Sequence, residues 1–156
     1  MTGGGTRRSL LAALALASFS AQGRDLAMES SGGAQYVCGG VGAEERRAMQ
    51  ALEATANLKL LFVTLRRGGY LADTAVEITD SGGAKRLRTT ADGPICLLQL
   101  PAGRYRVSAT FAGVTRTASV ALRGQPGRPQ QVALQFPAEP WDGIWASSEE
   151  KQQARE

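Results

Sequence analysis

Residues 92–109 read DGPICLLQLPAGRYRVSA, and this stretch decides the fold. An apolar run at 95–100 is followed by Pro101-Ala102-Gly103, and from Arg104 onward polar and apolar residues alternate. Alternation with a period of two is typical of a strand with one buried face. Proline restricts φ and glycine tolerates the left-handed conformation, so the middle tripeptide is predicted as a tight turn. The stretch therefore predicts two strands joined by a short turn.

The same pattern extends outward in both directions. Further strands are predicted before the stretch, at 58–65, 75–79 and 85–90, and after it, at 114–122 and around Leu134. Turn-forming residues separate them, among them Asp80-Ser81-Gly82-Gly83 and Ala112-Gly113. Seven short strands within residues 57–137 predict a mainly β fold, an antiparallel seven-stranded β-sandwich whose apolar side chains meet between two sheets.

The central stretch also resembles a known family. It matches the pattern G-x-x-x-x-x-x-L-P-x-G-x-Y-x-V-x-A of the carboxypeptidase regulatory-like domain family, whose members have a transthyretin-like (prealbumin-like) β-sandwich. The matching turn and core residues are Gly93, Leu100, Pro101, Gly103, Tyr105 and Val107. The resemblance, to small exported bacterial members, covers about half of the chain. It implies the fold and says little about function, because sandwiches of this class carry unrelated roles.

The chain of 156 residues has no histidine, and this absence excludes several kinds of catalytic site. A Ser-His-Asp triad, a Cys-His pair and a histidine-bearing zinc site cannot be built from it. Transthyretin-like hydrolases depend on catalytic histidines, so the resemblance does not extend to them. The acids Asp73, Glu77, Asp80 and Asp92 lack the D-x-D spacing of a calcium loop, and we expect them to cap turns or face solvent. No catalytic residue, cofactor or metal site is predicted, and the protein is not expected to be an enzyme.

Residues 1–20 are predicted as a signal peptide. Arg7 and Arg8 precede a short apolar run at 10–17, and small residues at Ser18 and Ser20 suit a cleavage site. The run is too short to span a bilayer, so no stable membrane span is expected after cleavage. The paired arginines leave general export and twin-arginine export both open. The protein is therefore expected in the periplasm or outside the cell.

Two cysteines, Cys38 and Cys96, are a candidate disulfide, because thiols rarely stay reduced in an oxidising compartment. The alternative is a pair of buried free thiols. Cys38 lies in residues 21–42, a flexible lead-in rich in Gly, Ser and Ala, in which only Tyr36 and Val37 offer much to bury. Residues 43–56 are predicted as a helix with acids in its first turn and a thin apolar stripe that includes Met49.

Charge is distributed unevenly. Between Lys85 and Arg128 the chain carries eight basic residues and one acidic residue. The arginines at alternate strand positions, without interleaved aromatic residues, favour a solvated sheet face, and no nucleic-acid partner is predicted. Residues 138–156 form a tail in which Trp141 and Trp145 can dock on the sandwich or on a partner. The tail has five acidic and two basic residues: Glu139, Asp142, Glu149, Glu150 and Glu156 against Lys151 and Arg155.

Taken together, these features predict a non-catalytic exported module that binds another protein or serves as an accessory component of the cell envelope. Its expected partner is an envelope protein that the sequence does not identify. The alternative is a periplasmic module that binds a glycan or small ligand through Tyr70, Trp141 and Trp145.

Overall fold

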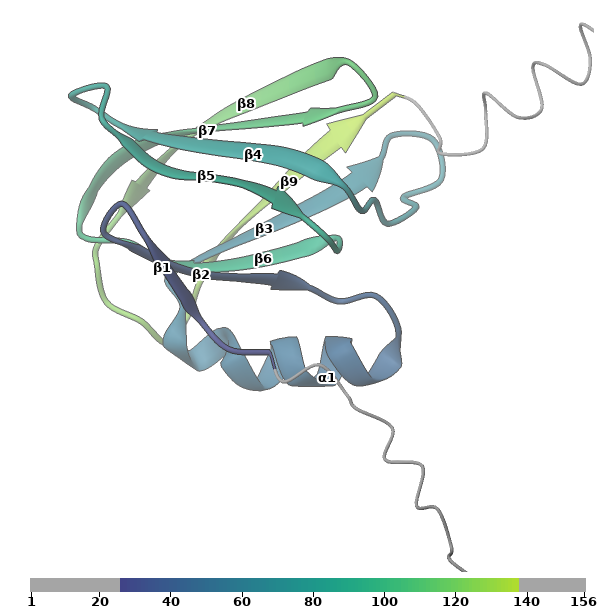
Figure 1. Cartoon of the computed structure of the whole chain (residues 1–156), viewed down its shortest axis with the longest axis horizontal. Helices are drawn as coiled ribbons and strands as arrows, with labels where there is room; N and C mark the ends of the chain where they lie inside the picture. Colours follow the sequence, from purple (N-terminus) through teal and green to yellow (C-terminus); the bar gives the residue numbers. More distant parts are fainter. Residues whose placement is uncertain (1–25, 138–156) are drawn as a thin grey trace, which may run out of the picture.

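Alternating apolar residues place most of the chain in strands, and the computed structural model, which describes residues 26–137, arranges them in two sheets with one helix outside them (Figure 1). The five-stranded sheet contains, in spatial order, β1 (Glu29–Ser31), β2 (Ala34–Gly39), β6 (Ile95–Gln99), β3 (Leu58–Thr64) and β9 (Gln130–Phe136). The four-stranded sheet contains β5 (Lys85–Ala91), β4 (Thr74–Asp80), β7 (Gly103–Phe111) and β8 (Val114–Leu122). Helix α1 (Ala43–Leu52) continues into a 3₁₀ turn, η1 (Glu53–Thr55).

The prediction of seven antiparallel strands was wrong in two respects. All seven strands predicted within residues 57–137 form, as β3 to β9, but β1 and β2 add two more from the predicted lead-in. Small residues make β2 weakly apolar, so its sequence pattern is faint, yet it pairs along its length with β6. In addition, β3 and β9 run parallel, from Leu58↔Gln130 to Thr64↔Phe136. The pair is parallel because the chain leaves the four-stranded sheet after β8 and crosses to the other sheet before it forms β9.

The main core lies between the two sheets. As predicted, alternate residues of β7 (Tyr105, Val107 and Ala109) are buried, and Leu60 and Phe62 of the interior strand β3 face them across the core. The outer face of β3 is also largely covered, which explains why that strand is apolar on both faces. Lys85–Ala91 forms an edge strand, a position that suits its mostly polar sequence.

A second, smaller cluster lies on the outer face of the five-stranded sheet, beneath α1. Met49 of the helix is 1% exposed and packs with Val37, Ala56 and Leu97. Glu45, in the first turn of α1, accepts hydrogen bonds at its Oε2 from the backbone N–H groups of Gly40 (3.1 Å) and Val41 (3.0 Å), which precede the helix. These bonds fix the conformation of the chain where the helix begins. The thin apolar stripe is therefore enough to cover the part of this sheet face that β2 and β6 form.

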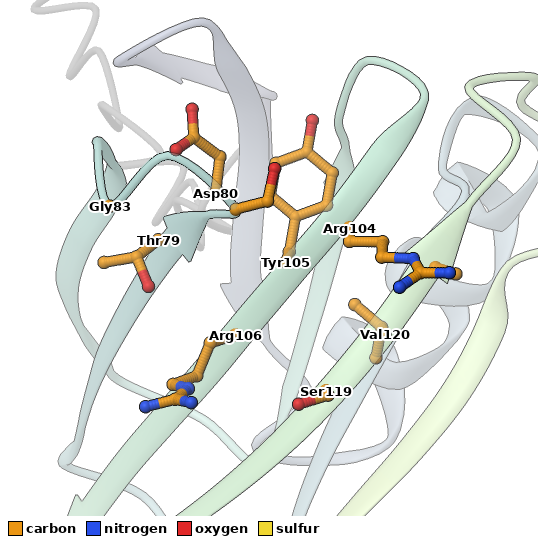
Figure 2. Close-up of a pocket in the computed structure, with 10 residues that line it drawn as sticks. Thr79, Asp80, Gly83, Arg104, Tyr105, Arg106, Ser119 and Val120 are labelled. Carbon is orange, nitrogen blue, oxygen red and sulfur yellow. The ribbon is translucent and has the colours of Figure 1, made fainter.

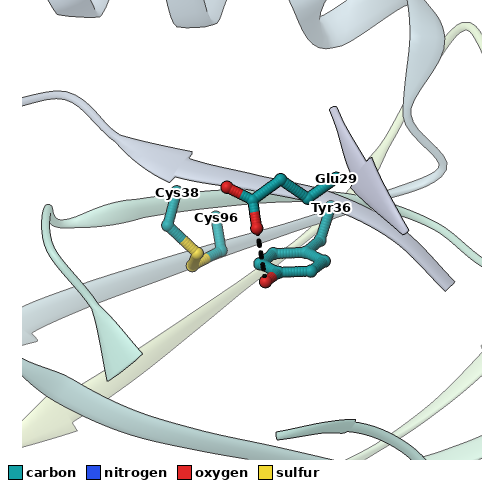
Figure 3. Close-up of a disulfide and its surroundings, with 4 residues drawn as sticks. All are labelled: Glu29, Tyr36, Cys38 and Cys96. Atoms are coloured by element: carbon teal, nitrogen blue, oxygen red, sulfur yellow. Dashed lines mark hydrogen bonds between the residues drawn. A yellow bond between two sulfur atoms is a disulfide. The ribbon is translucent and has the colours of Figure 1, made fainter. Parts of the chain in front are cut away.

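The predicted disulfide is present. Cys38 and Cys96 are paired across β2 and β6, with 4.1 Å between their Cα atoms, and the bond lies on the inner face of the sheet (Figure 3). Beside it, the Tyr36 hydroxyl donates to Glu29 Oε2 at 2.9 Å, which ties β1 to β2. This hydrogen bond, together with burial, raises the pKa of Tyr36. The disulfide therefore fastens β2, whose strand pattern is faint in the sequence, to β6.

Asn57 connects the beginning of β3 to the end of β6. Its side chain donates to the carbonyl oxygen of Leu100 (2.8 Å) and accepts from the N–H of the same residue (3.1 Å). Its backbone bonds to Leu98 and to Gln130, so it touches both neighbours of β3. The carboxamide is buried, at 5% exposure for the residue, and it replaces a backbone pair at the point where the ladder ends.

Candidate binding surface

The outer face of the four-stranded sheet is open to solvent over all four strands within residues 26–137. The five-stranded sheet carries α1 on its outer face, whereas the outward residues of the four-stranded sheet are exposed or half-buried. They lie in register across four strands, because alternate residues of each strand enter the core. These residues, here called the arginine face, are Ala75, Glu77, Thr79, Lys85, Arg88, Thr90, Arg104, Arg106, Ser108, Thr110, Thr115, Thr117, Ser119 and Ala121. The face carries four basic side chains and one acidic side chain, and every other position is Thr, Ser or Ala.

A shallow hollow of about 630 Å³ lies at one end of this face (Figure 2). Its walls come from β4, the β4–β5 turn, β7 and β8. Figure 2 shows Arg104 and Arg106 extending from β7, with Thr79 on the β4 side and Ser119 on the β8 side. We call the pocket, with these residues and its further lining, the arginine hollow. The further lining consists of Asp80, Ser81, Gly83, Tyr105, Val120 and Ala121.

Arg104 and Arg106 give the hollow its positive charge. They are two residues apart on one strand, so both point to the same face at a spacing of about 7 Å. Both are exposed, and neither forms a hydrogen bond or ion pair with another residue in the described part of the chain. By contrast, Lys85 pairs with Glu77 at 3.2 Å. Two guanidinium groups next to serine and threonine hydroxyls can hold a carboxylate or another oxyanion.

Asp80 shapes the turn that forms one wall of the hollow. Its Oδ1 accepts from the backbone N–H groups of Gly82 and Ala84, each at 2.9 Å, and its Oδ2 accepts from Arg86 Nε at 2.9 Å. The backbone bond from Ala84, followed by the bond from Arg86, holds the pKa of Asp80 below its ordinary value of 3.8. Asp80 is thus a turn-capping residue, as predicted, and its charge is already used within the protein.

Tyr105 lies between the two arginines in sequence and points the opposite way. Its ring is in the core, and its hydroxyl donates to the carbonyl oxygen of Pro101 at 2.7 Å. Burial raises its pKa. Gly103 has φ of 156° and lies beside this ring, because a Cβ atom on it would be 3.7 Å from Tyr105 Cε2. Tyr105 thus lies on the core side of the hollow, whereas the positive charge of the hollow comes from Arg104 and Arg106.

Of the three predicted ligand contacts, the structure describes Tyr70. Tyr70 is exposed, at 59%, and bridges to Val63 in the loop that precedes β4. That loop enters β4 at Thr74, whereas the arginine hollow lies beyond Asp80, at the other end of the strand. Trp141 and Trp145 lie outside the described residues. The sequence placed the arginines on a solvated face, but it could not show that β4 and β8 bring Thr79 and Ser119 beside them.

The four acids considered for calcium are used in different ways. Glu77 pairs with Lys85, and Asp80 caps its turn. Within residues 26–137 no three His, Cys, Asp or Glu side chains are grouped so that they could hold a metal ion. In the same part of the chain, no helix has the length and apolar character needed to cross a membrane.

Comparison of the chain with protein-family models and with curated proteins finds no match. The resemblance of residues 92–109 to the carboxypeptidase regulatory-like family therefore stays a prediction. The fold that the structure describes is mainly β, with sheets of five and four strands and one short helix.

Proposed function

We propose that this protein is a non-catalytic binding module of the cell envelope that meets another envelope protein through the arginine face. The observation that carries the proposal is the pair formed by Arg104 and Arg106. An exposed arginine is ordinary, but here two guanidinium groups lie side by side in a hollow and have no partner among residues 26–137. On a face that no described element covers, such a pair suits a partner that presents oxyanions. The absence of histidine from the chain removes the commonest general base and favours binding over catalysis.

The proposed fold family is the transthyretin-like sandwich of carboxypeptidase regulatory-like domains. The contact between Tyr105 and Pro101 supports it, because this contact gives a physical reason for the shared L-P-x-G-x-Y pattern. The tyrosine fills the end of the core, and the proline carbonyl satisfies its hydroxyl.

Export to the periplasm or beyond is part of the proposal. The disulfide supports it, since such bonds persist mainly in oxidising compartments. Intact-mass measurement of the protein recovered from the periplasmic fraction tests it. A mass that matches loss of residues 1–20 is expected, and recovery of the uncleaved chain from the cytoplasm alone would contradict it.

Partner binding is tested by site-specific loss of capture. The full-length protein is cross-linked in cells, and captured envelope proteins are compared between the wild type, Arg104→Gln/Arg106→Gln and Arg66→Gln/Arg67→Gln. The last variant removes the same charge from two exposed arginines before Tyr70, at the end opposite the hollow. A partner that is captured by the wild type and the control, lost in the first variant and bound again when purified supports the proposal. Equal capture by all three contradicts the assigned surface.

A glycan or small ligand is the second candidate, and the exposure of Tyr70 favours it. Tyr70 and Leu65 are 59% and 52% exposed in the same loop, and an exposed aromatic side chain can stack on a sugar ring. Titration of the labelled protein with soluble peptidoglycan fragments, followed by NMR, tests this. Shifts centred on Tyr70 that disappear in Tyr70→Ala are expected, and an unchanged spectrum would remove this candidate.

A further inference from the structure

We propose that the acidic segment of residues 138–156 docks on the arginine hollow of its own chain and shields it. The arginine hollow is positively charged and its two arginines have no partner among residues 26–137, and a segment with an excess of acidic residues follows β9 in the sequence. The shielding of a partner site rests on the proposed function, whereas the docking itself does not.

Charge complementarity is the first argument. The arginine face has four basic residues and one acid, and that acid, Glu77, is paired with Lys85. The segment 138–156 has five acids and two bases. Within it, Glu149 and Glu150 are adjacent, so two carboxylates are offered together to two guanidinium groups. Among the described residues, Asp80 is the acid that lines the hollow, and it is already bonded to Arg86.

The position from which the segment starts is the second argument. Phe136, at the end of β9, packs edge-to-face on Phe111, with 5.9 Å between ring centroids. Phe111 ends β7, and Arg104 lies near the other end of the same strand, about 24 Å away at 3.4 Å per residue. An extended chain from Pro137 reaches about 40 Å by Glu149, which covers this length together with the ~10 Å between sheets. Glu139 and Asp142 lie too near Pro137 in sequence to reach the hollow.

Tethering explains why the chain's own segment is favoured over a separate acidic molecule. Exposed ion pairs are individually weak and are screened by salt. A short tether, however, holds the acids near the hollow at an effective concentration in the millimolar range, so weak pairs are enough to populate the docked state. A competing envelope protein must then displace the segment, which makes the hollow selective for partners of higher affinity.

The two tryptophans provide the test, because both lie in this segment, at 141 and 145, and none lies elsewhere in the chain. Time-resolved fluorescence anisotropy of the full-length protein, excited selectively at tryptophan, reports how much of the segment rotates with the domain. In the wild type at low salt we expect a dominant slow component. In Arg104→Gln/Arg106→Gln that component falls about twofold or more, and raising salt to about 1 M lowers the wild type to the same level.

Two controls make the result specific. Arg66→Gln/Arg67→Gln, with the same net charge, keeps the wild-type anisotropy. Arg104→Glu/Arg106→Glu loses the slow component, and adding Glu149→Arg/Glu150→Arg restores it. Circular dichroism verifies that each variant is folded. An unchanged slow component in Arg104→Gln/Arg106→Gln, an equal loss in the Arg66/Arg67 variant, or no restoration by the charge exchange would each overturn the proposal. Failure of partner capture leaves these fluorescence results unaffected, so the two proposals fail separately.

Discussion

At the residue scale, the carboxamide of Asn57 supplies both a donor and an acceptor to the backbone of Leu100, a residue that is fully buried. Water cannot replace either bond at this depth. A hydrophobic side chain in this position would leave a buried N–H and a buried C=O without partners, and each such group costs about 1–3 kcal/mol. The Asn57 carboxamide is therefore needed to satisfy the buried N–H and C=O groups of Leu100.

Asn57→Ala is expected to lower the free energy of unfolding by about 2–3 kcal/mol, because both Leu100 groups lose their partner. Urea denaturation followed by circular dichroism measures the change. Gln50→Ala, at an exposed position of α1, is the control and should change stability by less than about 0.5 kcal/mol. A wild-type midpoint in Asn57→Ala would show that the carboxamide bonds contribute nothing to stability.

Asp80 makes stability depend on acid pH. Because its pKa is lower in the folded protein than the ordinary 3.8, its stabilising effect is complete above that value. The effect is lost as the pH falls through the lower, folded-state pKa. We expect Asp80→Asn to be less stable than the wild type at pH 6 and to approach it near pH 2, as measured by urea midpoints. Asp73→Asn, which removes an exposed charge, is the control, and a constant difference between Asp80→Asn and wild type would contradict this linkage.

Gly93 shows which part of the turn chemistry the sequence predicts and which part it does not. Its presence in Asp92-Gly93-Pro94 predicts a turn, and the turn forms. The stronger reason for glycine is distant in sequence: a Cβ atom here would lie 2.3 Å from the carbonyl oxygen of Gly39 at the end of β2. Local pattern identifies turn residues, whereas close contact between segments fifty residues apart depends on the assembled sheet.

At the scale of the elements, the β7–β8 hairpin contains a residue that suits its conformation poorly. The loop is Ala112-Gly113, closed by the pair Phe111↔Val114, and both residues have positive φ, 49° and 78°. Two-residue hairpin loops of this kind favour Asn-Gly, since alanine is disfavoured in the left-handed region by roughly 1 kcal/mol. The hairpin forms because β7 and β8 pair over nine residues each, which outweighs the local cost.

Ala112→Asn is therefore expected to stabilise the protein by about 0.5–1 kcal/mol, because asparagine tolerates positive φ. Thermal unfolding gives the change in Tm, and Ala121→Asn, at an exposed strand position, serves as the comparison and should not stabilise. If Ala112→Asn leaves Tm at or below the wild-type value, the hairpin loop is not strained.

The strands themselves were predictable, but their neighbours were not. Period-two alternation identified β3 to β9 and the inward side of β7, because burial of one face imposes that period. The parallel pair β3–β9 and the contribution of β2 arise from pairing between distant segments, which alternation does not encode. The same limit applies to the candidate site: the outward direction of Arg104 and Arg106 follows from parity, but the hollow they line requires the register of β7 with β4 and β8.

At the scale of the whole molecule, the Cys38–Cys96 bond joins the N-terminal strands to the middle of the chain, across 58 residues of sequence. A crosslink over a loop of this length restricts the unfolded chain and is worth about 4 kcal/mol in the chain-entropy model. It also holds β2 on β6, where half of the strand's residues are small or polar.

Reduction is expected to lower the free energy of unfolding by about 4 kcal/mol and to free two thiols in the unfolded protein. Urea denaturation with and without dithiothreitol, together with thiol titration in denaturant, measures both. Cys38→Ala/Cys96→Ala, which cannot form the bond, should resemble the reduced protein and be insensitive to dithiothreitol. Identical midpoints for the oxidised and reduced wild type would contradict the expected contribution.

The parallel pairing of β3 with β9 also determines when the protein can fold. β3 is an interior strand of its sheet, and one of its two neighbours is the last strand of the described chain. During synthesis, β3 remains without this neighbour until residue 136 has left the ribosome. Its other neighbour, β6, is also some forty residues away. Contacts this far apart in sequence give a high contact order, which predicts slow folding, on the scale of milliseconds to seconds. The newly made chain thus has to be extended through β9 before its apolar strand β3 is paired on both edges.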